Sequence, residues 1–599
     1  MGNLIYLSYE LTILVTQDMG DNRYSQLRYS LKLYLIKAIC GYFSLSWILL
    51  ILSSLSNAQT VPNPAVNNPP QPNKPQPLPE DLPKIISPDH LPANNFIQIS
   101  PERVPGSIVV KKFEIIGDRV LTPEIINRVV QPYLFRPISF VELLEVQNKI
   151  TQLYIDRGYI TTGAFIPPQT IEDRTIKVQI IEGKIEDIKI SGLKRLKSQY
   201  ILSRLAIATK PPLNQNELLN ALQLLQLDPL IAQISAELSA GIDPGTSFLQ
   251  INIQEADAFA LGFRLDNQRN PSVGSMRRQV ELNHHNLLGW GDRFHVSYVN
   301  TDGSNSLDDL SYAIPINARN GEIQLIHNRS NSEIISGEFQ TLDIDTQSRY
   351  YELTYRQPLH QTPTQDFTFG FTFSRQNSAT TLNDIPVRLS RGATIDGKTN
   401  ISTLRLWQEY SDRNSQQAYA IRSQFNFGID VFDPTINDND IPDSNFFTWR
   451  GQAQYLRLLN PDTSLLLRSD LQLADRGLVS LEQFSSGGEF SVRGYAQDTL
   501  LGDNGLFVSA ELRNTIARIP KWNTSLELIP FVDLGRVWNS DSAQLEKNTL
   551  SSLGLGLQLL VGDNFTARVD WGIPLTNIES KGDSLQEQGV HFFLDLTAF

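Results

Sequence analysis

Near its C-terminal end the chain reads Leu526-Glu527-Leu528-Ile529-Pro530-Phe531-Val532-Asp533-Leu534-Gly535, and this alternation decides the fold. The apolar residues Leu526, Leu528, Val532 and Leu534 share one parity, and Glu527, Phe531, Asp533 and Gly535 share the other. Successive side chains of a strand point to opposite faces of a sheet. The stretch therefore predicts a strand with one apolar face and one face that carries carboxylates.

The same alternation recurs throughout residues 257–599, between turns rich in Gly, Asn and Asp. Strands with one apolar and one polar face fit either a half-buried soluble sheet or a barrel in lipid. We favour an all-β transmembrane barrel, because a closed sheet leaves no backbone group unpaired in the bilayer. At about 20–22 residues per strand and turn, this region supplies about 16 antiparallel strands. A soluble β-sandwich or propeller is the alternative.

Composition narrows the class of protein. The net charge of −13 argues against a broad basic surface for nucleic acid, and the single Cys excludes a disulfide framework or a multi-thiolate metal site. The chain is 41% hydrophobic and 19% charged, which is too polar for a helical membrane protein and poor in charge for a soluble enzyme. A barrel that is apolar outside and polar inside gives this mixture.

The N-terminal region predicts export. Basic residues Arg28, Lys32 and Lys37 precede an apolar run that ends in small residues at Ala58, so residues 1–58 are interpreted as a signal peptide with a possible start at Met19. A membrane anchor is the alternative. Residues 59–106 form a proline-rich linker, because 11 of the 33 prolines fall between positions 61 and 93.

Two copies of one module follow, at residues 107–184 and 185–256. Ile188-Lys189-Ile190-Ser191-Gly192 repeats the pattern of Phe113-Glu114-Ile115-Ile116-Gly117. Each copy then continues with two helical patterns and two strands, and a capping box at Ser139 and Glu142 marks one helix start. We predict two small α+β units of order β-α-α-β-β, with exposed sheet edges that could accept an added strand. A single α+β domain is the alternative.

The sequence contains one match to a nucleotide-binding motif and none to two common catalytic motifs. Residues 392–399 satisfy the phosphate-loop spacing G-x-x-x-x-G-K-T, but the segment that follows has strand composition instead of the helix such a loop needs. The seven His residues show no H-E-x-x-H spacing, and no G-x-S-x-G elbow occurs. We therefore predict no enzyme activity, catalytic residue, metal, nucleotide or other cofactor.

A glycine-rich segment, residues 484–495, interrupts the strands and carries one arginine, Arg493. Strand parity places Asp533 inside the barrel, where we expect its carboxylate to pair with a positively charged side chain. Arg493 is the candidate if its loop folds inward, and glycine at 535 would let the loop approach the wall closely.

Two motifs resemble those of two-partner secretion outer-membrane transporters (TpsB, haemolysin secretion/activation type), which belong to a POTRA-plus-barrel superfamily. They are the loop motif Val492, Arg493, Gly494 and Tyr495 and the inner-wall motif Phe531, Asp533 and Gly535. Residues 154–159 are similar to a POTRA segment as well.

The resemblance implies that the arginine loop folds into the pore and that its tip pairs with the wall aspartate. It further implies a pore of the outer membrane, with POTRA-like domains in the periplasm that capture an unfolded, secreted partner protein. The expected partners are that protein and outer-membrane lipid, without nucleic acid or nucleotide. A barrel-assembly (insertase) factor is the alternative in the same superfamily, and a passive porin or receptor barrel is the alternative from another class.

Overall fold

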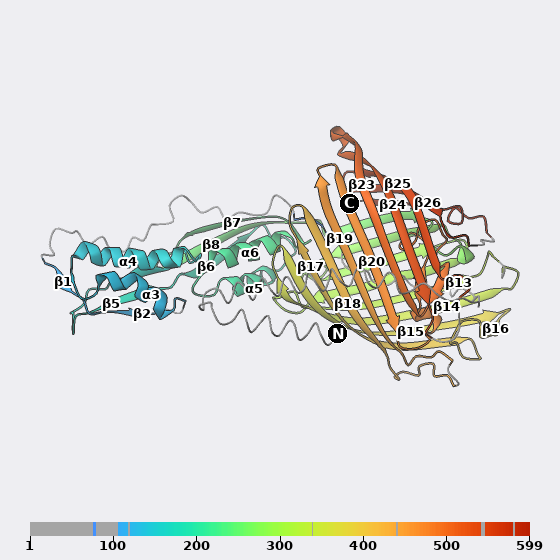
Figure 1. The fold of residues 1–599 in the computed structure, drawn as a ribbon, viewed down its shortest axis with the longest axis horizontal. Helices are drawn as coiled ribbons and strands as arrows, with labels where there is room; N and C mark the ends of the chain where they lie inside the picture. The colour runs from blue at the N-terminus through green and yellow to red at the C-terminus, as the bar shows by residue number, and fades with distance from the viewer. Residues whose placement is uncertain are drawn as a thin grey trace, which may run out of the picture. The chain divides into compact units, whose positions relative to one another are not determined.

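The computed structural model describes residues 76–78, 106–117, 120–337, 340–438, 441–540, 545–578 and 582–598 (Figure 1). The expected signal peptide, nearly all of the linker and the terminal Phe599 lie outside the described residues. Among the described residues, no helix has both the length and the apolar composition needed to span a bilayer.

The first α+β unit has its helices packed on a small sheet. Its elements are β1 (Ile108–Val109), β2 (Lys112–Ile116), α3 (Pro123–Val130), the 3-10 turn η2 (Gln131–Tyr133), β3 (Pro137–Ile138), α4 (Phe140–Ile155), β4 (Gly163–Phe165) and β5 (Thr175–Ile181). The main sheet has the order β2-β5-β4, with β2 parallel to β5. The predicted capping box starts α4, because Glu142 N donates to Ser139 Oγ and Ser139 N donates to Glu142 Oε2.

The second α+β unit repeats this order of elements. It contains β6 (Lys184–Ser191), α5 (Ser198–Ala208), α6 (Gln215–Gln226), β7 (Ile231–Ala240) and β8 (Thr246–Glu255). Its sheet has the order β6-β8-β7, with β6 parallel and β7 antiparallel to β8. The outer edges of this sheet are therefore β6 and β7. Apolar side chains from both helices, β7 and β8 form one buried cluster, and partly buried side chains of β6 pack against it.

The C-terminal region is a closed antiparallel barrel of sixteen strands, as predicted (Figure 1). The strands are β9 (Phe259–Asp266), β10 (Arg277–His285), β11 (Arg293–Asn300), β12 (Ser304–Pro315), β13 (Glu322–Glu333), β14 (Ile344–Gln361), β15 (Gln365–Leu382), β17 (Lys398–Arg413), β18 (Gln417–Gly428), β19 (Phe447–Asn460), β20 (Thr463–Ala474), β23 (Asn504–Ile519), β24 (Thr524–Trp538), β25 (Thr549–Val561), β26 (Phe565–Pro574) and β27 (Val590–Ala598). The last strand, β27, pairs with the first, β9, and closes the wall. A two-residue strand, β16 (Ile385–Pro386), joins the edge of β15.

Short elements lie between the barrel strands. They are the 3-10 turns η3 (Pro271–Val273), η4 (Ser480–Glu482) and η5 (Pro520–Trp522), and the hairpin strands β21 (Phe484–Ser486) and β22 (Leu500–Gly502). The hairpin bounds residues 484–502, which we call the arginine loop. The phosphate-loop match at residues 392–399 leads straight into strand β17, so it lacks the helix that would hold a phosphate.

Alternation along the strands separates an outer apolar face from an inner polar one. In β24, Val532 is 53% exposed and Leu534 is 45% exposed on the outside, whereas Asp533 between them is 0% exposed. The parity argument from the sequence is therefore confirmed for this strand. The lumen is left with the polar and charged side chains that build the site.

Candidate functional site

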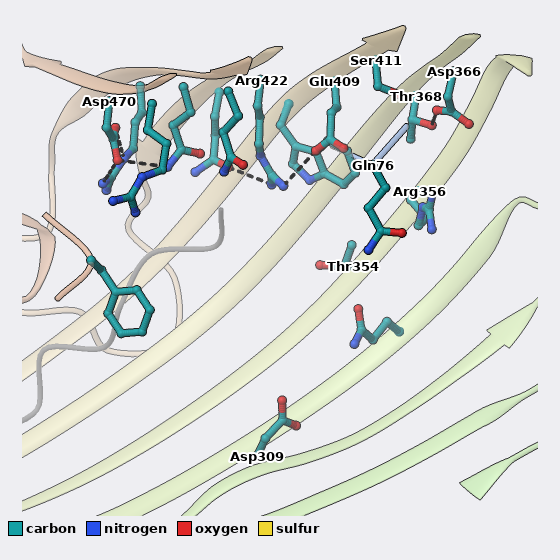
Figure 2. A pocket seen from close by; sticks show the side chains of 18 of the residues that line it. Gln76, Asp309, Thr354, Arg356, Asp366, Thr368, Glu409, Ser411, Arg422 and Asp470 are labelled. Atoms are coloured by element: carbon teal, nitrogen blue, oxygen red, sulfur yellow. Dashed lines mark hydrogen bonds and ion pairs between the residues drawn. The ribbon is translucent and has the colours of Figure 1, made fainter. Parts of the chain in front are cut away.

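The lumen holds a cavity of about 1790 Å³. The arginine loop contributes seven residues to its lining: Phe484, Ser485, Glu489, Phe490, Ser491, Gln497 and Asp498. Most other lining residues are polar or charged side chains of the barrel strands. Figure 2 shows Arg422 of β18 and Glu409 of β17 pointing toward each other, with a closest N–O distance of 3.7 Å. Gln76, from the short described segment 76–78, also lines this cavity (Figure 2).

Arg493 and Asp533 meet as predicted, in a bidentate pair that is fully buried. Arg493 Nε donates to Asp533 Oδ2 and Nη2 donates to Oδ1, both at 2.8 Å. The backbone N of Arg493 also donates to Oδ2 at 3.2 Å, and Ser509 Oγ donates to Oδ1 at 2.6 Å. The guanidinium carbon lies 3.6 Å from the centre of the Phe531 ring, which adds a cation–π contact. Both side chains are 0% exposed, so their attraction is weakly screened.

A second carboxylate, Glu511 of β23, binds the same arginine and was missed by the sequence analysis. Arg493 Nη1 donates to Glu511 Oε1 at 2.8 Å. Arg468 and Arg568 also donate to Oε1, at 3.2 and 3.4 Å, and Arg513 donates to Oε2 at 3.0 Å. Glu511 therefore lies among four guanidinium groups. Strand parity could have placed Glu511 in the lumen. It could not have predicted that Glu511 lies at the same level of the barrel as Arg493.

Asp570 and Arg568, both on β26, complete the cluster. Arg568 Nε donates to Asp570 Oδ2 at 2.7 Å, and Asp570 Oδ1 lies 3.9 Å from Arg493 Nη1. We call Arg493, Asp533, Glu511, Asp570 and Arg568 the charge cluster. Three barrel strands and the arginine loop thus share one buried ionic network.

Glycines allow the loop to lie this close to the wall. A Cβ on Gly535 would come within 2.2 Å of Ser486 Oγ and 2.6 Å of Val492 Cγ2, as the sequence argument anticipated. Gly494 has φ +96° and packs on Gly572 of β26, where a Cβ would come within 2.6 Å of the Gly494 N. Gly572 was not singled out from the sequence.

The remaining motif residues fix the loop on either side of Arg493. Val492 is fully buried in an apolar cluster that includes Tyr495. The Tyr495 hydroxyl lies 2.8 Å from Ser551 O and 3.0 Å from Thr576 O, and it accepts a hydrogen bond from Thr576 N at 2.9 Å. The whole loop motif is therefore engaged with the wall.

Chemically, this arrangement can hold and release a segment of chain. Within the described ranges, no group of three or more His, Cys, Asp or Glu side chains is placed to hold a metal. Breaking a buried ion pair by losing one partner costs about 3–5 kcal/mol, because the other charge stays buried. Loss of any one member of the cluster therefore disfavours the seated loop, while every contact in the cluster is reversible.

Comparison with known families gives two matches. The family model of haemolysin secretion/activation protein ShlB/FhaC/HecB matches residues 245–559, which is more than half of the chain. The model of the ShlB-type POTRA domain matches residues 108–183, the first α+β unit.

Individual relatives agree with these matches. The heme/hemopexin transporter protein HuxB of Haemophilus influenzae (strain 86-028NP) is 23% identical over 490 residues, which covers 78% of this chain and 84% of HuxB. The outer membrane transporter CdiB of Dickeya dadantii (strain 3937) is 23% identical over 423 residues, covering 68% of this chain and 72% of that protein. Among solved structures, CdiB from Escherichia coli has a TM-score of 0.65 at 18% identity, covering 83% of this chain and 92% of that one.

Proposed function

Because the chain belongs to the haemolysin secretion/activation protein family, ShlB/FhaC/HecB, we propose that it exports one unfolded partner protein through its lumen. It is an outer-membrane transporter of the two-partner secretion type, with its POTRA units in the periplasm. The HuxB and CdiB relatives are likewise named as transporters. The proposed cycle has no catalytic step.

The observation that carries this proposal is the arginine loop seated inside the lumen by the charge cluster. A polypeptide can pass only after the loop has moved away from the wall. The lumen surface is polar and charged, which suits a hydrated, extended chain. Our proposal uses no nucleotide, so the direction of transport comes from the partner folding outside the cell.

Of the two edge strands in the second α+β unit, β7 is better suited than β6 to bind an extended segment of the partner. It is a ten-residue edge strand with one charged residue, Glu237, and no proline. The opposite edge, β6, carries Lys184, Glu186, Asp187 and Lys189. Charged residues blunt sheet edges against strand pairing. We therefore propose that an extended segment of the partner adds to β7, where backbone hydrogen bonds supply affinity with little dependence on sequence.

Deleting the gene tests the function. We expect one large protein to disappear from the culture medium and to be trapped in the periplasm. Comparison of the two fractions by mass spectrometry, with and without a plasmid copy of the gene, checks this. A general loss of barrel proteins from the outer membrane would favour the insertase alternative instead. A change confined to small-solute uptake would favour the porin alternative.

A proline in β7 tests the capture edge. Ala236→Pro removes one backbone donor from the outer edge, because the amide of Ile234, two residues earlier on the same side of the strand, points away from β8 to Gln226 Oε1. Export of the partner should therefore fall about tenfold, the equivalent of one or two lost hydrogen bonds. Ile190→Pro in β6 is the matched control, because its amide lies on the same outward side as that of Ile188, at the opposite edge of the same sheet. Equal loss of export in both variants, with equal protease resistance of the unit, would argue against β7 as the capture strand.

A further inference from the structure

A polar side chain outside the charge cluster, Gln586, connects the arginine loop to the junction between the first and last barrel strands. Gln586 lies in the loop between β26 and β27 and is 0% exposed. A glutamine amide has two donors and an acceptor and is costly to bury unless they are satisfied. Here all of these groups have partners, and the partners belong to two other segments of the chain.

Gln586 first binds the arginine loop. Its Oε1 accepts a hydrogen bond from the backbone N of Gln497 at 2.7 Å, two residues after Tyr495. The backbone O of the same Gln497 accepts a hydrogen bond from Asn270 Nδ2 at 3.0 Å. Both backbone groups of one loop residue are therefore held from outside the loop.

Gln586 then binds the segment that follows β9. Its Nε2 donates to the backbone O of Arg269 at 2.6 Å and also to the backbone O of Asn267. Asn267 in turn extends the pairing of β9 with β27, because its Nδ2 donates to Val590 O and its Oδ1 accepts from Phe592 N, both at 2.8 Å. The loop is thus tied to the place where the barrel wall closes.

We propose that Gln586 is a positioning residue that keeps the arginine loop seated by fixing its backbone at Gln497 to the end of the first strand. The charge cluster holds the loop at Arg493, and Gln586 holds it four residues further on. Release of the loop then requires both attachments to break. This inference concerns the closed state of the pore. It rests on the proposed function only in taking release of the loop to be the step that lets the partner pass.

Only glutamine satisfies all three contacts in this geometry. Methionine has nearly the same length and volume but makes no amide hydrogen bonds. Glutamate keeps an acceptor for Gln497 N, but it would turn a carboxylate oxygen toward the carbonyls of Asn267 and Arg269. Both Gln586→Met and Gln586→Glu should therefore weaken the attachment while leaving the space filled.

Conductance of the purified, detergent-refolded protein in planar bilayers tests the proposal without the partner. Gln586→Met should raise the fraction of time in the open state about tenfold, the equivalent of one or two lost hydrogen bonds. The matched control is Gln588→Met, since Gln588 is exposed in the same loop and its side-chain amide donates to Asp583 O within that loop. Heat-modifiable migration on SDS gels confirms that each barrel is folded, and Gln586→Glu replaces the methionine variant if that one does not fold.

The Arg493→Ala background separates positioning of the loop from a general effect on the barrel. There the loop is already unseated for most of the time, because the attachment at Gln497 alone is too weak to hold it. Adding Gln586→Met should therefore change the open fraction less than about twofold, because coupled residues are not additive. Unchanged conductance in the single variant would overturn the proposal. The same tenfold rise in both backgrounds would overturn it too, because Gln586 would then act on the wall and not through the loop. Failure of partner export with this conductance pattern intact would count only against the proposed function.

Discussion

Arg493→Ala is expected to abolish export of the partner protein while the barrel still inserts into the outer membrane. The substitution leaves Asp533 buried with Ser509 as its remaining side-chain donor. A carboxylate stranded in this way costs about 3–5 kcal/mol, which corresponds to at least about a hundredfold loss of the seated loop. The amount of partner in the medium measures the loss, and heat-modifiable migration of the barrel on SDS gels measures folding.

Arg422→Ala is the matched control for this prediction. Arg422 also projects into the lumen, but its charged partner is Glu409 on the neighbouring strand and its ring contact is Trp407, both part of the wall. Export should therefore persist in this variant. Normal export by Arg493→Ala would contradict a transport role for the loop. Loss of the folded barrel in both variants would show that both arginines are needed for the stability of the barrel.

The barrel was predictable because strand parity is a local property of the sequence. In β24 the apolar residues on one parity face outward and Asp533 faces inward, so one strand was enough to place the site on the inner wall. The pairing with Arg493 followed because the glycine-rich segment carries a single arginine. The repeated units were predictable as well, since each begins with the same strand pattern and that strand ends at a glycine.

The rest of the cluster depends on register, which sequence patterns do not contain. Glu511 lies opposite Phe531 across the β23–β24 pair, and Asp570 lies opposite Gly556 across the β25–β26 pair. A shift of two residues in either pair would keep every parity and remove these carboxylates from Arg493. Gln586 was out of reach for a related reason, because in the sequence it lies 89 residues from Gln497 and 319 residues from Asn267.

A charge swap, Arg493→Asp combined with Asp533→Arg, is expected to leave export as low as in Arg493→Ala. An isolated pair would tolerate exchange, but position 493 also faces Glu511 at 2.8 Å and Asp570 at 3.9 Å. A carboxylate placed there meets two like charges in a buried site, and each such contact opposes seating of the loop. The partner assay in medium and periplasm again provides the measurement.

Arg450 and Asp470 supply the matched swap. They form a bidentate pair across β19 and β20, with N–O distances of 2.9 and 2.6 Å. Among the described residues, no second carboxylate forms an ion pair with Arg450. Exchanging these two charges should retain most of the export, because the moved carboxylate meets no like charge in the described part of the barrel. The exchange gives up only a hydrogen bond from Gln452 to Asp470 and the contact of Arg450 with the Phe484 ring, each worth about 1 kcal/mol. If the Arg493 and Asp533 swap restored export to a similar level, the pair alone would be sufficient to seat the loop. The role we assign to Glu511 and Asp570 would then be wrong, because two unmoved carboxylates beside a third must destabilise a buried site.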